Sequence, residues 1–168
     1  MLKRFENYIK ENKREKIIEY IYTGDINKLL KLLEDKRLNK EEINIILRNI
    51  FKILIRVNNK KKIEKLLINC ISQGGDINQK DEDGYSVLMN SIFITENAIK
   101  AVLIQKPDLY YINDKFIEPA DIFKFVKDIS IRDKNDKKLK MFYKALQEIE
   151  PEIYREQKKK EREKKYNI

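Results

Sequence analysis

An acidic run, Asp81 to Asp83, is the feature of this sequence that most suggests chemistry, because clustered carboxylates are common ligands of calcium. A calcium loop of about twelve residues ends in a glutamate. The twelfth position here is Val87 when counted from Asp76 and Ile92 when counted from Asp81. The acidic run is therefore interpreted as the solvent-facing tip of a hairpin, and no metal site is predicted.

Nucleophilic catalysis would need a base that this sequence lacks. The chain contains no histidine, which excludes Ser-His-Asp and Cys-His catalysis and imidazole metal ligands. Its one cysteine, Cys70, lies between Leu67 and Ile71 on an apolar helix face, a position typical of core residues. No P-loop or dinucleotide-binding glycine pattern occurs. The sequence therefore predicts a protein that is not an enzyme, with no catalytic residue and no cofactor.

The charge balance raises the question of nucleic-acid binding. The 168 residues include 37 Lys and Arg against 28 Asp and Glu, for a formal net charge of +9. Of these cations 29 are lysines and 8 are arginines, whereas base recognition and stacking favour arginine. A joint bias toward Lys, Asn and Ile is also what an A+T-rich genome produces. We therefore favour a solvated lysine surface over a nucleic-acid footprint.

Several features predict a cytoplasmic, soluble protein that does not enter a membrane. The N-terminal residues lack the apolar run of a secretory signal. No stretch approaches the roughly 20 apolar residues of a membrane-spanning helix. Cys70 alone cannot form an internal disulfide, so nothing requires an oxidising compartment. Only four Gly and three Pro occur in the chain, which favours one compact, mostly helical domain.

Apolar residues recur at helical spacing as far as Ser72 and predict two antiparallel helix pairs. In the first pair, Gly24 ends one helix and Asp25 caps the next. The second pair begins with one long apolar stripe, from Ile43 to Ile55, and turns at Asn58 and Asn59.

The chain changes character after these pairs, because residues 73–84 are polar and rich in turn formers. Gly84 supplies the positive φ of a tight reversal, and Ser86 caps the helix that follows. A partner helix starts near Ala98. A second polar loop precedes a further helix, whose expected start at residues 118–122 places Pro119 in the first turn.

These segments resemble the ankyrin-repeat family, in which a helix pair and a turn-rich loop recur about every 33 residues. Residues 74–92 read GGDINQKDEDGYSVLMNSI and are similar to the family's G-A-D-V-N-x-x-D-x-x-G-x-T-P-L-H-x-A. Residues 23–35 read TGDINKLLKLLED and are similar to its G-D-x-x-x-V-x-x-L-L. Residues 113–122 match more loosely. Val87 and Met89 stand where the family has Pro and His, so the repeats are expected to be divergent.

The resemblance implies an all-α fold, an ankyrin-like helical repeat solenoid of about four helix-turn-helix units with a C-terminal capping helix. The implied divisions are a repeat region at 1–130, with units at 15–38, 39–77, 78–109 and 110–130, a capping helix at 131–152 and a basic, charged tail at 153–168.

The predicted capping helix carries apolar residues at helical spacing, namely Leu139, Phe142, Leu146, Ile149 and Ile153. This stripe is expected to cover the open end of the stack, which predicts a monomer. The alternative is that the stripe meets a second chain. Pro151 is expected to end or kink this helix.

The resemblance also implies a function, the binding of a protein partner, because hairpin tips and first helices form a concave binding face in this family. Carried over by position, that face comprises Glu82, Asp83, Tyr85, Asn90, Phe93, Asp114, Lys115 and Ile117. Tyr85 and Phe93 would be aromatic anchors, and the acidic tip would steer association. The alternative is a nucleic-acid-associated factor that uses residues 132–168, which hold 13 Lys and Arg against 8 Asp and Glu.

Overall fold

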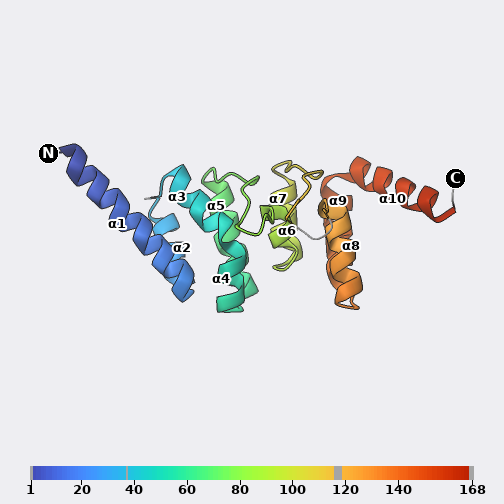
Figure 1. Cartoon of the computed structure of the whole chain (residues 1–168), viewed down its shortest axis with the longest axis horizontal. Helices are drawn as coiled ribbons and strands as arrows, with labels where there is room; N and C mark the ends of the chain where they lie inside the picture. The colour runs from blue at the N-terminus through green and yellow to red at the C-terminus, as the bar shows by residue number, and fades with distance from the viewer. Residues whose placement is uncertain (1, 37, 116–118, 167–168) are drawn as a thin grey trace.

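The computed structural model describes residues 2–36, 38–115 and 119–166, with side chains described from residue 13 to residue 165 of these ranges. Within them the chain forms ten helices and no strand, so the prediction of an all-α fold is confirmed for the described residues (Figure 1). The helices are α1 Leu2–Thr23, α2 Ile26–Glu34, α3 Lys40–Arg48, α4 Ile50–Val57, α5 Lys60–Ser72, α6 Val87–Ser91, α7 Glu96–Leu103, α8 Ile122–Arg132, α9 Lys137–Ile149 and α10 Pro151–Tyr166.

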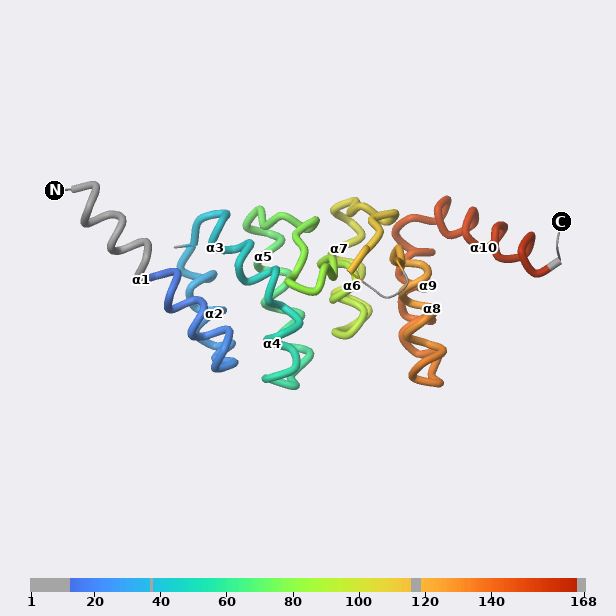
Figure 2. Tube along the Cα trace, in the orientation of Figure 1, coloured from blue at the N-terminus to red at the C-terminus, as the bar shows by residue number. Residues whose placement is uncertain are grey.

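Eight of the ten described helices lie in two rows along the long axis of the molecule, while α3 packs on α1, α4 and α5, and α10 packs on α9. Helices α1, α4, α6 and α8 contact one another in that order and form the first row. Helices α2, α5, α7 and α9 form the second row, also in chain order. Figure 2 shows that the chain progresses from one end of the molecule to the other without returning. Each helix of these rows therefore packs against its neighbours along the row.

Local signals fix where most helices begin. The side chain of Asp25 accepts the backbone N–H of Lys28, and that of Ser86 accepts the N–H of Met89, so both predicted caps are confirmed. Gly84 has a φ of 80°, in the left-handed region that favours glycine. The predicted reversal before α6 is therefore confirmed as well.

The long helix predicted over residues 43–55 is interrupted at Asn49, between α3 and α4. Asn49 has a φ of −107° and a ψ of 11°, and its Nδ2 donates to the carbonyl of Ile45 at 2.8 Å. An asparagine side chain that bonds to nearby backbone competes with the helical ladder. The apolar stripe continues across the break, which is why periodicity alone predicts one helix.

The helix predicted to start at residues 118–122 begins later than expected. Helix α8 starts at Ile122, and its cap is Asp121, whose side chain accepts the N–H of Lys124. The carbonyl of Ala120, two residues before α8, accepts the N–H of Asn113 in the second polar loop at 3.1 Å. Pro119 therefore precedes the helix and does not occupy its first turn.

The C-terminal helices pack on the body of the molecule. Helix α9 contacts both α7 and α8, and its Phe142 and Leu146 are fully buried. It is thus the partner of α8, within the stretch predicted as a separate cap. Helix α9 ends at Ile149 and α10 begins at Pro151, so the predicted interruption at this proline is confirmed. Helix α10 packs against α9.

Two hydrogen bonds join loops to the preceding part of the stack. The N–H of Asp76 donates to Oδ1 of Asn44 at 2.9 Å, across 32 residues of sequence. The N–H of Asp108 donates to Oδ1 of Asn78 at 3.2 Å, across 30 residues. In both bonds an asparagine side-chain oxygen accepts the backbone N–H of a loop residue. Each bond therefore fixes one loop relative to the part of the chain before it.

The core runs continuously through both rows. Cys70 is fully buried in it, so its predicted place among core residues is confirmed. Burial raises the pKa of its thiol. A search of the described helices for one with the length and apolarity needed to cross a bilayer found none.

Candidate functional site

The candidate site is the face formed by the first row of helices and the loop of residues 79–86, here called the front face. The second row covers the other side of these helices, so only this side of the first row is open to a partner. It carries most of the residues that the ankyrin resemblance assigns to partner binding.

Four aromatic side chains meet on the front face and connect three helix pairs. The ring centroids of Phe51 and Phe93 are 5.1 Å apart, and those of Tyr85 and Phe125 are 5.5 Å apart in an edge-to-face arrangement. Phe51 also lies 6.2 Å from Tyr85, as Phe93 does from Phe125. Phe51, Tyr85 and Phe93 are half-buried, whereas Phe125 is buried. We call these four residues the aromatic cluster.

The predicted anchors Tyr85 and Phe93 thus lie in one cluster, but the prediction missed Phe51 and Phe125. Both missed residues belong to apolar helical stripes and were indistinguishable in sequence from core positions. Burial, followed by the charge of Asp83, raises the pKa of the Tyr85 hydroxyl. The phenol therefore stays neutral at physiological pH and offers an apolar ring with a polar edge.

The acidic tip is held against α4. Nζ of Lys52 lies 2.6 Å from Oε2 of Glu82, and this hydrogen bond raises the pKa of the lysine. The carboxylate of Asp81 accepts three hydrogen bonds, from the N–H groups of Asp83 and Tyr85 and from Nδ2 of Asn90. Asp81 therefore organises the tip, and the side chain of Asp83 stays exposed.

Asn90 is not presented on the surface as expected. It is 2% exposed, and its Nδ2 donates to Asp81 at 3.0 Å. Within the described residues its Oδ1 has no hydrogen-bond partner. The resemblance places Asn90 at an exposed helix start, but α6 is short and the acidic tip folds over it. Asn90 thus supports the loop from inside.

The second loop supports the acidic tip from its other side. Nδ2 of Asn113 donates to the carbonyl of Asp83 at 3.0 Å, and the ammonium of Lys115 donates to the carbonyl of Glu82. Lys115 is therefore engaged with the first loop. Asp114 is exposed. The last predicted contact residue, Ile117, lies outside the described residues.

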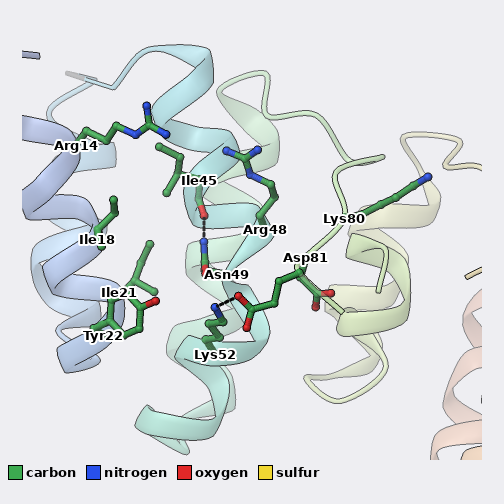
Figure 3. A pocket seen from close by; sticks show the side chains of 11 residues that line it. Arg14, Ile18, Ile21, Tyr22, Ile45, Arg48, Asn49, Lys52, Lys80 and Asp81 are labelled. Carbon is green, nitrogen blue, oxygen red and sulfur yellow. Dashed lines mark hydrogen bonds and ion pairs between the residues drawn. The ribbon is translucent and has the colours of Figure 1, made fainter. Parts of the chain in front are cut away.

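A groove opens on the front face between α1, the junction of α3 and α4, and the acidic tip (Figure 3). Its cavity volume is about 320 Å³. Ile21 and Ile45 are buried at its base, Ile18 is 37% exposed, and Tyr22 is 57% exposed. The sequence did not predict this groove, because it depends on how α1 crosses the helices of the next pair.

The aromatic cluster and the groove of the front face are chemically suited to contact with another molecule. Among the described residues, no group of three or more His, Cys, Asp or Glu side chains is placed to hold a metal ion. Comparisons of the chain with protein-family models, curated proteins and solved structures found no match.

Proposed function

We propose that this chain is a divergent ankyrin-like repeat solenoid and acts in the cytoplasm as a monomeric, non-catalytic protein-binding module. The aromatic cluster on the open side of the first helix row carries this proposal. Three half-buried aromatic rings, one of them with Nζ of Lys138 4.7 Å from its centroid, are the kind of anchor that dominates protein interfaces.

A recurrence of local hydrogen bonds supports the repeat interpretation. Asp76 accepts the N–H of the residue two positions on, and so does Asp108 in the second loop. Asp81 and Asn113 each accept in the same way, and they are separated by the same length of chain. This shared spacing is close to the period of about 33 residues in ankyrin repeats.

The nucleic-acid alternative rests on residues 132–168, and ion pairs within the protein already engage part of the charge of α10, which belongs to this segment. Nζ of Lys158 lies 2.9 Å from a carboxylate oxygen of Glu161, and Lys159 lies 3.9 Å from Glu163. The remaining lysines and arginines lie on a solvated helix, which supports only weak, salt-sensitive contact with phosphates. The protein-binding function therefore comes first.

The test is capture of partners from an extract of the native cell by the immobilised full-length chain. Replacing Tyr85 and Phe93 together by alanine should reduce capture at least about tenfold, because both anchors are lost. Since both rings are half-buried, a second variant with leucine at these positions preserves bulk, and circular dichroism checks the fold of each.

The matched control replaces two exposed apolar residues that lie outside the aromatic cluster. Tyr110 and Ile104 are 52% and 57% exposed, and alanine at both positions should leave capture unchanged. Equal capture by the wild type and by both Tyr85 and Phe93 variants would show that the cluster is not the binding site.

A further inference from the structure

We infer that the front-face groove binds a short acidic segment of a partner protein, with an apolar side chain of that segment inserted between α1 and α4. This inference rests on the proposed function and names the chemistry of its partner. The argument uses the base of the groove, the charges at its mouth and the net charge of the chain.

The base of the groove suits an apolar side chain. Ile21 and Ile45 are 1% and 5% exposed, so they form a firm surface, while Ile18 is 37% exposed beside them. A cavity of about 320 Å³ is at the small end of the range for ligand sites. It therefore accommodates side chains of a peptide and not a folded element.

The mouth of the groove carries arginines. Figure 3 shows Arg14 from α1 and Arg48 from α3 directed toward one another across Ile45. No ion pair of Arg14 occurs among the described residues, and Arg48 has only an exposed contact with Glu41 at 3.5 Å. Two planar guanidinium groups this close to an apolar base match the carboxylates of a peptide.

Arginine is scarce in this chain, which makes its placement informative. Only 8 of the 37 cationic residues are arginines, and two of them line the groove. A third, Arg56, lies 5.4 Å from the ring centroid of Tyr22 at the groove rim. Arginine is enriched at protein interfaces, whereas lysine is depleted there.

The acidic residues of the groove do not neutralise this pair of arginines. The Asp81 carboxylate is occupied by three donors of its own loop and α6, and Glu82 is paired with Lys52. Asp81 lies at the opposite end of the groove from Arg14 (Figure 3). A bound segment would therefore place its carboxylates toward the arginines and its apolar residue over the isoleucines.

The net charge of the chain favours a different protein as the occupant. A second copy would also carry +9, and like charges oppose self-association at an arginine-lined groove. A nucleic acid would satisfy the arginines but would leave the isoleucines without a partner and bring phosphates toward Asp81 and Glu82. An acidic segment with an apolar residue fits both parts of the groove.

The probe is the fluorescein-labelled, end-capped decapeptide EELEELEELE, titrated with the full-length protein and followed by fluorescence anisotropy. Two comparison peptides, EEGEEGEEGE and KKLKKLKKLK, remove the apolar residue and reverse the charge. We expect saturable binding of the first peptide alone, weakened by added salt.

The decisive variant carries Arg14→Glu and Arg48→Glu, and the expected result is a loss of affinity of at least about tenfold. The matched control carries Lys16→Glu and Lys61→Glu, which changes net charge equally at exposed sites outside the groove. Its affinity should stay within about twofold of the wild type. A third variant, Ile18→Ser, tests the apolar contact and should also weaken binding.

The inference is overturned if the leucine peptide binds no tighter than the glycine peptide, or if both charge variants lose affinity equally. Tighter binding of a single-stranded oligothymidine would overturn it in favour of a polyanion site. The proposed function and the groove assignment can fail independently. If partner capture requires Tyr85 and Phe93 but no acidic peptide binds, the protein-binding module stands and the groove assignment is wrong.

Discussion

Glu161 is one of the residues that attach α10 to the rest of the protein, and its replacement tests the energetics of that attachment. Its Oε1 accepts the hydroxyl of Tyr143 at 2.7 Å and lies 2.6 Å from Nζ of Lys127, while its Oε2 accepts Lys158 at 2.9 Å. Burial alone would raise the pKa of Glu161, but these three donors lower it from 4.5 to about 2.

A pKa lowered on folding means that the ionised carboxylate stabilises the folded state; Lys127 and Tyr143 act across the contact of α10 with α8 and α9, whereas Lys158 lies within α10. The contribution is fully present above about pH 4.5 and is lost as the pH falls toward 2. At neutral pH a change of this size corresponds to at most about 3 kcal/mol. Because Lys127 and Lys158 are 42% and 38% exposed, solvent screening reduces the expected value to about 1 to 2 kcal/mol.

The change is Glu161→Gln, and the measurement is the rate of tryptic cleavage within α10 at pH 8, followed by mass spectrometry. Cleavage requires local opening, so a loss of about 1 to 2 kcal/mol should accelerate it about 5- to 30-fold. Near-ultraviolet circular dichroism should show the wild type losing its Tyr143 environment between pH 4.5 and 2. The variant should show a smaller change over this range, because other carboxyl groups with lowered pKa values still titrate.

Glu163→Gln is the matched control, because Glu163 lies in the same helix but has only a 3.9 Å contact with Lys159. It should be cleaved at the wild-type rate. The reasoning is refuted if Glu161→Gln leaves cleavage unchanged, or if Glu163→Gln accelerates it to the same extent.

Three further predictions concern packing. Gly84→Ala should lower the free energy of unfolding by about 2 to 4 kcal/mol in urea titrations, since φ is +80° and the new Cβ would clash with Oδ1 of Asn113. Its control is Gly74→Ala, at φ +82° in open space, which should cost about 1 kcal/mol. Equal losses of stability in the two variants would contradict the role given to Asn113. Phe142→Ala should cost about 3 to 5 kcal/mol in the same assay, because the ring is fully buried between α8 and α9; a loss below about 1 kcal/mol would mean that α9 does not complete the core. Cys70 should react with iodoacetamide at pH 8 far more slowly in the native protein than in urea, because burial raises its pKa, and equal rates would show that it is accessible.

Local features of the fold could be predicted from the sequence because they depend on neighbouring residues alone. A glycine before a polar residue and a helical stripe specifies a reversal and a cap, which is why Gly24 and Asp25 were placed correctly. The same reasoning placed Gly84 and Ser86. A tight reversal or a helix cap has few alternative backbone conformations, so the residue type is enough to predict it.

Features that depend on tertiary contacts were missed or misplaced. The break at Asn49 comes from a side chain that can equally well face solvent in a continuous helix. Asn90 is buried because Asp81 folds back over α6, a contact that no helical pattern encodes. The placement of Arg14 and Arg48 on the same groove depends on how two helices cross, and periodicity gives the face of a helix but not its neighbour.

The two hydrogen bonds that join a loop to the preceding part of the stack have a consequence for how fast the chain folds. They join Asn44 to Asp76 and Asn78 to Asp108, separations of 32 and 30 residues in a chain of 168. Closing loops of this size costs somewhat less entropy than pairing the two ends of the chain, and folding rates rise as contacts become more local. If the chain is the repeat solenoid proposed above, neighbouring helix pairs would form first and order would spread from them along the stack.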